Sequence, residues 1–122
     1  MQALLLIAHG SRRQASNEEV RELTRVLEQH ADQAFSVVEC AFLELAEPSI
    51  PDGVSACVAK GASSVTVLPY FLSAGRHVTT DIPEELQKAQ QQHAKVEIKL
   101  APYLGSAKEI SSILISLSKQ AC

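Results

Sequence analysis

Two histidines follow two of the most apolar segments of the sequence, and together they could bind a metal ion or move protons. His9 lies in LLLIAHGSR, and His77 ends LPYFLSAGRH. In a parallel α/β sheet, ligands bind in the crevice beyond the carboxyl ends of the strands. Neutral imidazole is a common metal ligand and a plausible base near neutral pH. The pair therefore predicts one shared site, although each histidine alone is also compatible with an ordinary loop residue.

A carboxylate is expected near the two histidines. Glu44 follows the second strand-like segment and would reach the same edge, although Glu47 competes for this role and either could be a solvated loop residue. Two histidines and one carboxylate suit borderline divalent metals that keep open coordination positions. The other two histidines, His30 and His93, lie near the expected ends of helices and are not assigned to the site.

Three arginines flank the two histidines in a protein that is acidic overall. They are Arg12, Arg13 and Arg76. Arginine matches the geometry of a carboxylate through bidentate hydrogen bonds. We therefore expect an anionic substrate, held by these arginines together with Ser11.

Four strand-like segments alternate with four helical patterns along the chain. The strands are expected at 3–8, 35–42, 63–70 and 95–102, and the first helix at about 17–31. Continuous apolar runs suit strands that are covered on both faces, whereas the alternating last segment is typical of an edge strand. The order βαβαβαβα implies right-handed crossovers. We therefore expect an α/β fold, a three-layer sandwich with a four-stranded parallel sheet and helices on both faces.

Polar residues mark the expected starts of three helices. Ser16 and Glu19 form an S-x-x-E capping box before the first helix. Ser49 precedes the second helix, and Asp81 with Glu84 forms a similar box before the third. The last helix carries the apolar stripe Ile110, Ile113, Leu114 and Leu117. Such a stripe is typical of a helix that packs against a core.

Composition and charge restrict the function classes. The 122 residues carry a net charge of −3, with 46% hydrophobic and 20% charged residues, as expected for one globular domain over 1–122. An acidic chain of this kind is not expected to bind nucleic acid. No apolar run approaches the roughly 20 residues of a membrane span, and the start of the chain is interpreted as a strand rather than a signal peptide. Cys40, Cys57 and Cys122 form no CxxC pair, so we expect a reducing compartment, the cytoplasm.

Several common motifs of catalysis and cofactor binding are absent from the sequence. Without GxxxxGK[ST] we expect no use of ATP, and without GxGxxG after the first strand we expect no dinucleotide. No GxSxG nucleophile elbow is present. A phosphohistidine at His9 would have arginines nearby to hold phosphate. However, Ala8 stands where histidine phosphatases have the arginine of their R-H-G pattern, which disfavours this function.

The segments LLLIAHGSR, FLELAEPSI and LPYFLSAGRHVTTDIP together resemble those of the sirohydrochlorin chelatases. These enzymes insert cobalt or iron in cobalamin and sirohaem synthesis, and the resemblance covers nearly the whole chain in the family's short form. It implies a chelatase-like, flavodoxin-like fold and a homodimer that recreates the two-domain arrangement of longer members. It also implies metal-site histidines at His9 and His77, and the acidic residue of the family's FLE segment at Glu44.

The residues and the resemblance lead to one expected function and one alternative. The expected function is ATP-independent insertion of Co²⁺ or Fe²⁺, with Ni²⁺ as a further candidate, into sirohydrochlorin. His9 and His77 would be catalytic and, with Glu44, would bind the metal. The flanking arginines would hold the carboxylates of the tetrapyrrole, and Phe71 and Leu72 could form an apolar wall. The alternative is a non-catalytic carrier of metal or tetrapyrrole that uses the same histidines.

Overall fold

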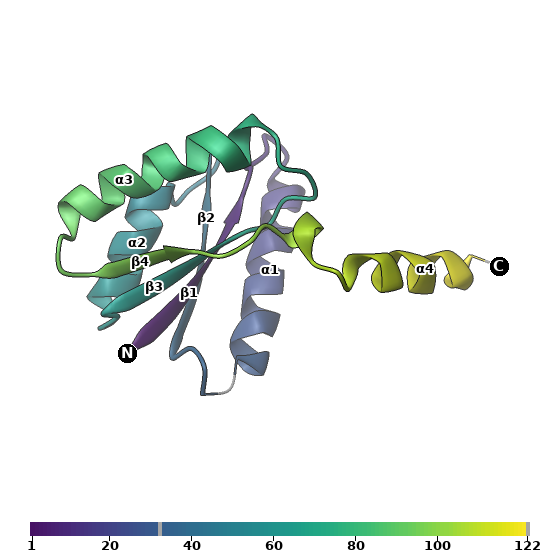
Figure 1. Cartoon of the computed structure of the whole chain (residues 1–122), viewed down its shortest axis with the longest axis horizontal. Coiled ribbons are helices and arrows are strands. Elements are labelled where there is room, and N and C mark those ends of the chain that lie inside the picture. Colours follow the sequence, from purple (N-terminus) through teal and green to yellow (C-terminus); the bar gives the residue numbers. More distant parts are fainter. Residues whose placement is uncertain (32, 122) are drawn as a thin grey trace.

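The computed structural model describes residues 1–31 and 33–121, which fold into three layers (Figure 1). The middle layer is a parallel sheet with the strand order β2-β1-β3-β4. Its strands are β1 (Gln2–Ala8), β2 (Val37–Phe42), β3 (Ser64–Pro69) and β4 (Glu97–Leu100). The helices beside it are α1 (Gln14–His30) on one face, and α2 (Ile50–Ala59) and α3 (Ile82–Gln92) on the other. The predicted α/β sandwich is confirmed.

Strand β1 lies in the middle of the sheet, and its position decides where the two histidines meet. It pairs with β2 on one side and with β3 on the other, so that Ala8 lies opposite Phe42 and Ile7 lies opposite Pro69. Its residues from Ala3 to Ala8 are buried, because helices cover both faces of the sheet here. Since the three strands end side by side, the loops that follow them leave the sheet at one edge.

Helix α1 begins earlier than predicted. Its N-cap residue is Arg13, whose side chain makes no capping hydrogen bond, and Ser16 lies inside the helix. The predicted Ser16–Glu19 capping box is therefore wrong. The side chain of Asn17 is 1% exposed; its Oδ1 accepts from the backbone N–H of Ser11 (2.9 Å), and its Nδ2 donates to the Ser11 carbonyl (2.8 Å). These two bonds tie the chain between β1 and α1 to the first turn, so the helix starts closer to the sheet.

Helix α2 begins as predicted. The Oγ of Ser49 accepts a hydrogen bond from the backbone N–H of Asp52 (3.2 Å). Pro51 lies in the first turn, where a missing N–H removes no helical hydrogen bond. Gly61, just beyond the helix, has φ +101°, the left-handed conformation typical of this position. Local sequence therefore sets both ends of α2.

The predicted capping box of Asp81 and Glu84 before α3 is wrong. A short π-helical turn, η1 (His77–Asp81), runs directly into α3. Asp81 consequently has helical backbone angles (φ −67°, ψ −44°) and caps nothing. Its carboxylate accepts a hydrogen bond from the ring of His77 instead. The segment between β3 and α3 is therefore helical from His77 onward.

The last strand belongs to the sheet, whereas the last helix lies outside the three layers. Strand β4 is an edge strand, as predicted, and pairs only with β3. The 3-10 turn η2 (Leu104–Ser106) then leads to α4 (Ile110–Gln120), which projects away from the three layers (Figure 1). Its apolar stripe is not buried, since Ile113, Leu114 and Leu117 are 48%, 57% and 56% exposed. Among the described residues, α1 is therefore the only helix that covers its face of the sheet.

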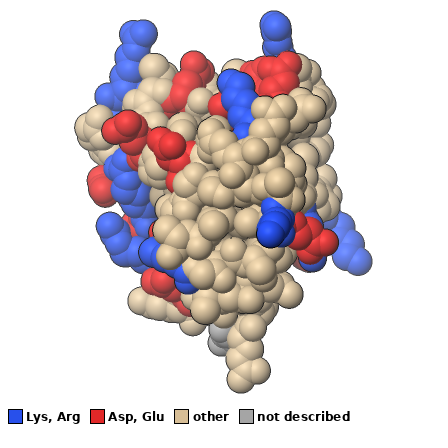
Figure 2. Space-filling view, turned by 90° about the vertical axis from the view of Figure 1, so that its left-hand side faces the viewer, with Lys and Arg blue, Asp and Glu red and all other residues tan. Residues whose placement is uncertain are grey.

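Charges of both signs are mixed on the surface. Figure 2 shows Lys and Arg side chains next to Asp and Glu side chains around an uncharged area. No helix in the described part of the chain is long and apolar enough to cross a membrane. Cys40 and Cys57 are free thiols, whereas Cys122 lies outside the described residues.

Candidate functional site

The loops after β1 and β2 touch through their backbones, and this contact brings His9 and Glu44 together. The N–H of Leu43 donates to the carbonyl of Ala8 (2.9 Å), and the N–H of Glu44 donates to that of His9 (3.0 Å). Gly10 permits this approach, because a Cβ atom on it would lie 1.7 Å from the carbonyl oxygen of Glu44. Its φ of +96° also favours glycine. Any side chain at position 10 would force the two loops apart.

The side chains of His9 and Glu44 form a hydrogen-bonded pair at this edge. Nε2 of His9 lies 2.6 Å from Oε2 of Glu44. A carboxylate only accepts hydrogen bonds, so Nε2 carries the proton and donates it, and the lone pair of the neutral ring lies at Nδ1. The two side chains are 46% and 52% exposed. The pair is therefore open to solvent and to ligands.

His77 has a partner within its own helical turn. Its Nδ1 donates to Oδ2 of Asp81 (2.8 Å), four residues further on in η1. The lone pair of the neutral ring therefore lies at Nε2, which makes no hydrogen bond to any residue that the structure describes. Asp81 was not among the predicted site residues. The signal that could have found it is the four-residue spacing, which brings two side chains together on a helical turn.

The two imidazole rings lie against each other, with Phe71 beside both. The ring centroids of His9 and His77 are 4.5 Å apart, and the planes are inclined by 36°. The centroid of Phe71 lies 6.5 Å from that of His9 and 6.4 Å from that of His77. Phe71 also packs against the core, whereas Leu72 is 72% exposed. The two histidines thus meet at one edge of the sheet, as the sequence predicts, while their roles stay predictions.

His9, Glu44 and His77 converge without forming a closed metal cage. Among the described residues, no three side chains of His, Cys, Asp or Glu are arranged to hold one metal ion. The shallow pocket beside them, of about 260 Å³, is lined by Leu43, Glu44, His77, Asp81, Glu84 and Glu85. A structural zinc site uses four protein ligands, whereas a reactive site keeps positions open.

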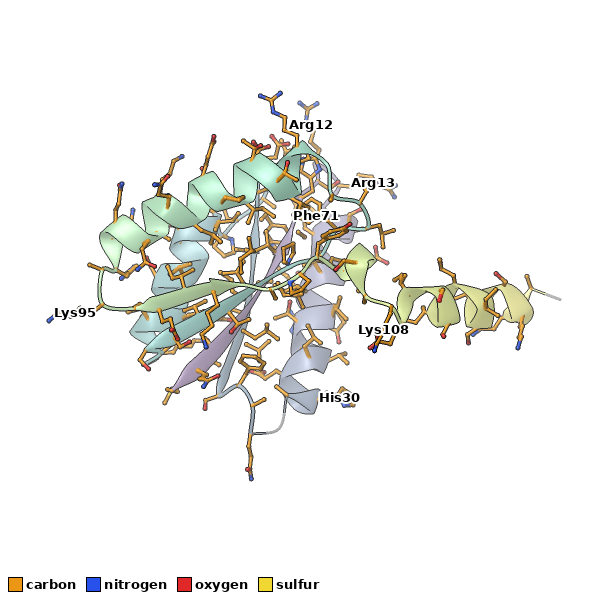
Figure 3. The ribbon with its side chains drawn as sticks, viewed as in Figure 1. Arg12, Arg13, His30, Phe71, Lys95 and Lys108 are labelled. Carbon is orange, nitrogen blue, oxygen red and sulfur yellow. The ribbon has the colours of Figure 1, made fainter. Side chains whose placement is uncertain are left out.

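The predicted anion-binding residues lie near the same edge. Arg12 and Arg13 are exposed on the segment before α1 (Figure 3), and Arg76 is exposed at the start of η1. None of the three forms an ion pair within the described chain. The Oγ of Ser11 accepts from the backbone N–H of Arg13 (3.0 Å) and so shapes this turn. His30 lies at the opposite end of α1 (Figure 3), away from the site.

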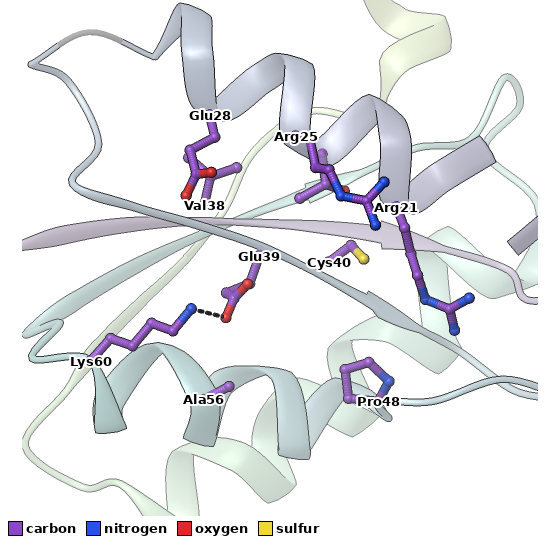
Figure 4. Close-up of a pocket in the computed structure, with 10 residues that line it drawn as sticks. Arg21, Arg25, Glu28, Val38, Glu39, Cys40, Pro48, Ala56 and Lys60 are labelled. Atoms are coloured by element: carbon purple, nitrogen blue, oxygen red, sulfur yellow. Dashed lines mark ion pairs between the residues drawn. The ribbon is translucent and has the colours of Figure 1, made fainter. Parts of the chain in front are cut away.

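A second hollow lies at the free edge of β2, and none of the site residues lines it (Figure 4). Its volume is about 410 Å³. The Nζ of Lys60 lies 2.7 Å from Oε1 of Glu39, and this hydrogen bond and charge raise the pKa of Lys60. Burial, followed by the charge of Glu39, raises the pKa of nearby Cys57 to about 11. That thiol is therefore protonated at neutral pH and is no nucleophile.

Known proteins resemble this chain over nearly its whole length. A family model described as CbiX matches residues 3–121. The chloroplastic sirohydrochlorin ferrochelatase of Arabidopsis thaliana is 38% identical over 102 residues, which cover 84% of this chain and 44% of that protein. The sirohydrochlorin cobaltochelatase of Sulfolobus acidocaldarius is 33% identical over 121 residues, covering 99% and 93%. The crystal structure of the sirohydrochlorin chelatase SirB from Bacillus subtilis subspecies spizizenii in complex with cobalt matches with a TM-score of 0.88 and 32% identity, covering 98% of this chain and 50% of SirB.

Fold and sequence together place the chain in a class of α/β proteins that includes the sirohydrochlorin chelatases. Within that class, the chain belongs to the CbiX family. The resemblance predicted from the three sequence segments is therefore confirmed. The chain spans less than half the length of the ferrochelatases from Arabidopsis thaliana, Priestia megaterium and Bacillus subtilis that it matches. The match thus corresponds to one portion of each of those larger proteins.

Proposed function

We propose that this protein inserts Co²⁺ or Fe²⁺ into sirohydrochlorin without ATP. The observation that carries the proposal is the convergence of His9, Glu44 and His77 at the carboxyl edge of a CbiX-family sheet. Relatives include a ferrochelatase and a cobaltochelatase, which supports either metal. Ni²⁺ is a further candidate, because the order of affinities depends more on the metals than on the site.

The metal ion is a substrate in this reaction and is held only until the macrocycle takes it. Nε2 of His77 already has a free lone pair. The lone pair at Nδ1 of His9 is likewise available, and Glu44 becomes available as a ligand when its hydrogen bond to His9 opens. Fewer than four protein ligands leave coordination positions for pyrrole nitrogens and for departing water. An open ligand set therefore favours transfer over storage.

Insertion also requires proton transfer. Four metal–nitrogen bonds form in the product, and two of them replace the pyrrole N–H bonds of the macrocycle, so each turnover releases two protons. The pair of His9 and Glu44 is half exposed, so it can accept these protons one at a time and pass them to solvent. General acid–base help of this kind contributes roughly 10²–10⁴-fold to a rate.

The surroundings of the site suit a flat macrocycle with carboxylate groups. Arg12, Arg13 and Arg76 are exposed without ion-pair partners in the described chain, so their guanidinium groups can bind the carboxylates. Phe71 beside the histidines and exposed Leu72 offer an apolar surface to the ring of the macrocycle. A single domain of this size leaves the other face of the ring uncovered.

We further propose that a second copy of the chain completes the enclosure in a homodimer. The exposed apolar stripe of α4 supports this, because a stripe of this kind is normally buried. A hollow along α1 of about 430 Å³, lined by Val20, Leu23, Val26 and Tyr70 among others, offers a surface on which such a stripe can pack. Sedimentation equilibrium tests the proposal: twice the chain mass of 13.2 kDa is expected, and Leu114→Lys should return the protein to a monomer.

Surface charge and thiol state favour a small anionic substrate in a reducing compartment, and we propose the cytoplasm. Charges of both signs alternate on the face shown in Figure 2, which offers no continuous basic surface for nucleic acid there. Cys40 and Cys57 are free thiols. Fractionation of the host cells, followed by detection of the native protein, tests the compartment.

Metal insertion is tested by mixing the metal-free protein with sirohydrochlorin and Co²⁺, Fe²⁺ or Ni²⁺ under anaerobic conditions. Faster change of the macrocycle's absorption spectrum than in protein-free controls is expected with at least Co²⁺ or Fe²⁺. ATP should make no difference. No acceleration with any of the three metals would contradict the proposed activity.

A metal or tetrapyrrole carrier is the alternative, since it could use the same histidines. The two functions differ in turnover. An enzyme releases the metallated product and forms more than one equivalent per chain, whereas a carrier stops at one.

A further inference from the structure

The two histidines of the site are held in opposite tautomers. His77 donates from Nδ1 to Asp81, so its lone pair lies at Nε2. His9 donates from Nε2 to Glu44, so its lone pair lies at Nδ1. Neutral histidine in water prefers the Nε2–H form, so His77 is the ring whose tautomer the protein reverses. The reversal needs a fixed acceptor at Nδ1, and Asp81 is that acceptor.

We propose that Asp81 is a positioning residue that prepares His77 to bind the metal ion. Its carboxylate fixes the ring as the Nδ1–H tautomer and holds its orientation, which presents Nε2 to the incoming ion. Histidines that bind metals usually donate their other ring N–H to a carboxylate or carbonyl, and such partners typically contribute 10–100-fold to metal affinity or activity. His9 donates its Nε2–H to Glu44, so its Nδ1 lone pair can bind the ion as well, while the pair with Glu44 also accepts protons.

The setting of Asp81 supports a fixed rather than an incidental contact. Asp81 and His77 are the two ends of η1, and the next residue, Ile82, is fully buried in the core. The side chain of Asp81 is 32% exposed, less than those of Glu44 and His9. At the other end, the N–H of Thr79 donates to the carbonyl of Gly75 (3.1 Å). The turn that carries both partners is therefore anchored by the core and by its own hydrogen bonds.

This inference rests on the proposed function, but the tautomer of His77 that it predicts can be measured without catalytic turnover. Long-range ¹H–¹⁵N correlation spectra of the metal-free protein report which ring nitrogen of His77 carries the proton. The signals of His77 are identified by their loss in His77→Ala. We expect the Nδ1–H pattern in the natural protein and a shift toward Nε2–H in Asp81→Leu, which has similar size but no acceptor.

Metal binding provides the second readout. Titration with Co²⁺ alone, followed by its visible absorption, should show about 10–100-fold weaker binding in Asp81→Leu. Asp81→Glu should recover part of the affinity, since it restores a carboxylate. The matched control is Asp52→Leu, which removes an exposed carboxylate from the first turn of α2 and should change neither the tautomer of His77 nor the affinity.

The possible outcomes separate this inference from the proposed function. An Nε2–H tautomer of His77 in the natural protein overturns the inference, and this measurement stands even if Asp81→Leu does not fold. Unchanged Co²⁺ affinity in folded Asp81→Leu overturns it as well. If the tautomer and the affinity respond as expected but sirohydrochlorin is never metallated, the role of Asp81 in metal binding is supported and the proposed activity fails.

Discussion

His9 and His77 share a site but are built into the molecule in different ways. Each ring is hydrogen-bonded to a carboxylate, at 2.6 Å and 2.8 Å, and the two rings are similarly exposed, at 46% and 43%. His9 finds its partner 35 residues away in a loop after another strand, whereas His77 finds its partner four residues away in one helical turn. The first pair depends on the whole sheet, and the second only on a local turn. Similar chemical groups can thus have very different structural requirements.

The largest expected effect separates the two histidines by function. His77→Ala should weaken Co²⁺ binding by more than about 100-fold and abolish metal insertion, because it removes a proposed metal ligand. His9→Ala should reduce insertion by roughly 10²–10⁴-fold, because it removes half of the proposed proton-accepting pair. Co²⁺ binding should fall less than in His77→Ala, because the loss of His9 frees Glu44 to bind the ion. Metal titration and single-turnover insertion kinetics give the two numbers for each variant.

His30→Ala is the control for both variants, because that side chain lies at the far end of α1 (Figure 3). It should leave binding and rate unchanged. Equal losses of Co²⁺ affinity in His9→Ala and His77→Ala would show that both rings contribute equally to metal binding and would contradict the expected difference between them.

The next effect tests the long-range requirement of the His9 pair. Gly10→Ala should destabilise the protein by at least about 2 kcal/mol, because it adds backbone strain at positive φ and a clash with the carbonyl of Glu44. It should also lower the insertion rate, since His9 and Glu44 are forced apart. Urea unfolding and the insertion assay measure the two effects.

Gly75→Ala is the matched control for Gly10→Ala. A Cβ atom at position 75 meets nothing within 4 Å, so stability should change by less than about 0.5 kcal/mol. The pair of Asp81 and His77 should persist in both glycine variants, because it needs only η1. If Gly10→Ala were as stable and active as the natural protein, the backbone contact between the loops would not be what positions Glu44.

A smaller effect is expected for the arginines that flank the two histidines, with Arg12 close to His9 in the sequence and Arg76 next to His77. Arg12→Ala and Arg76→Ala should each raise the KM for sirohydrochlorin by up to about fivefold, because an exposed ion pair contributes up to about 1 kcal/mol. The effects should multiply in the double variant if the macrocycle spans both histidines. Lys95→Ala removes the same charge elsewhere and should leave KM unchanged (Figure 3). An effect of Arg12 alone would place the substrate over His9 only.

The smallest effect concerns the hollow at the free edge of β2, which neither histidine lines. Lys60→Met should lower the free energy of unfolding by less than about 1 kcal/mol at pH 7, since the ion pair with Glu39 is partly exposed. The pKa of Lys60 is raised above 10.5 in the folded protein, so the stabilisation is fully present below pH 10.5 and is lost as the pH rises through the raised value. Urea unfolding across this range measures it. A change in the insertion rate of Lys60→Met would mean that this hollow takes part in the reaction.

Much of the fold could be predicted because continuous apolar runs mark the buried strands, whereas the apolar stripe of α4 is exposed in this structure. The strands and the edge position of β4 followed from apolar runs and alternation. Helix starts were less predictable, because tertiary contacts help to decide where a helix begins. Ser16 has a side chain that could cap α1, but it lies inside the helix. Asn17 binds the backbone of Ser11 and shifts the start of α1, whereas Ser49 has no such competitor and caps α2.

The site was predictable where it depends on strand ends and less so where it depends on side-chain geometry. Parallel strands place His9 and His77 at one edge regardless of detail. The partner of His77 was missed because S/T/D-x-x-E patterns suggest a cap, while the extra turn η1 gives Asp81 a different neighbour. The role of Gly10 could not be predicted, because it depends on how close the backbone at position 10 lies to the carbonyl oxygen of Glu44. That distance is known only from the folded structure.

If the proposed homodimer buries the half-exposed stripe of α4, the stability of this fold depends on the amount of protein present. If Ile113, Leu114 and Leu117 pack on a second copy, dissociation uncovers them again and mass action governs folding. The melting temperature should then rise with chain concentration, and dilution should unfold the protein in conditions where a monomeric domain would survive. A chain of this kind has no single melting temperature, only one for each concentration.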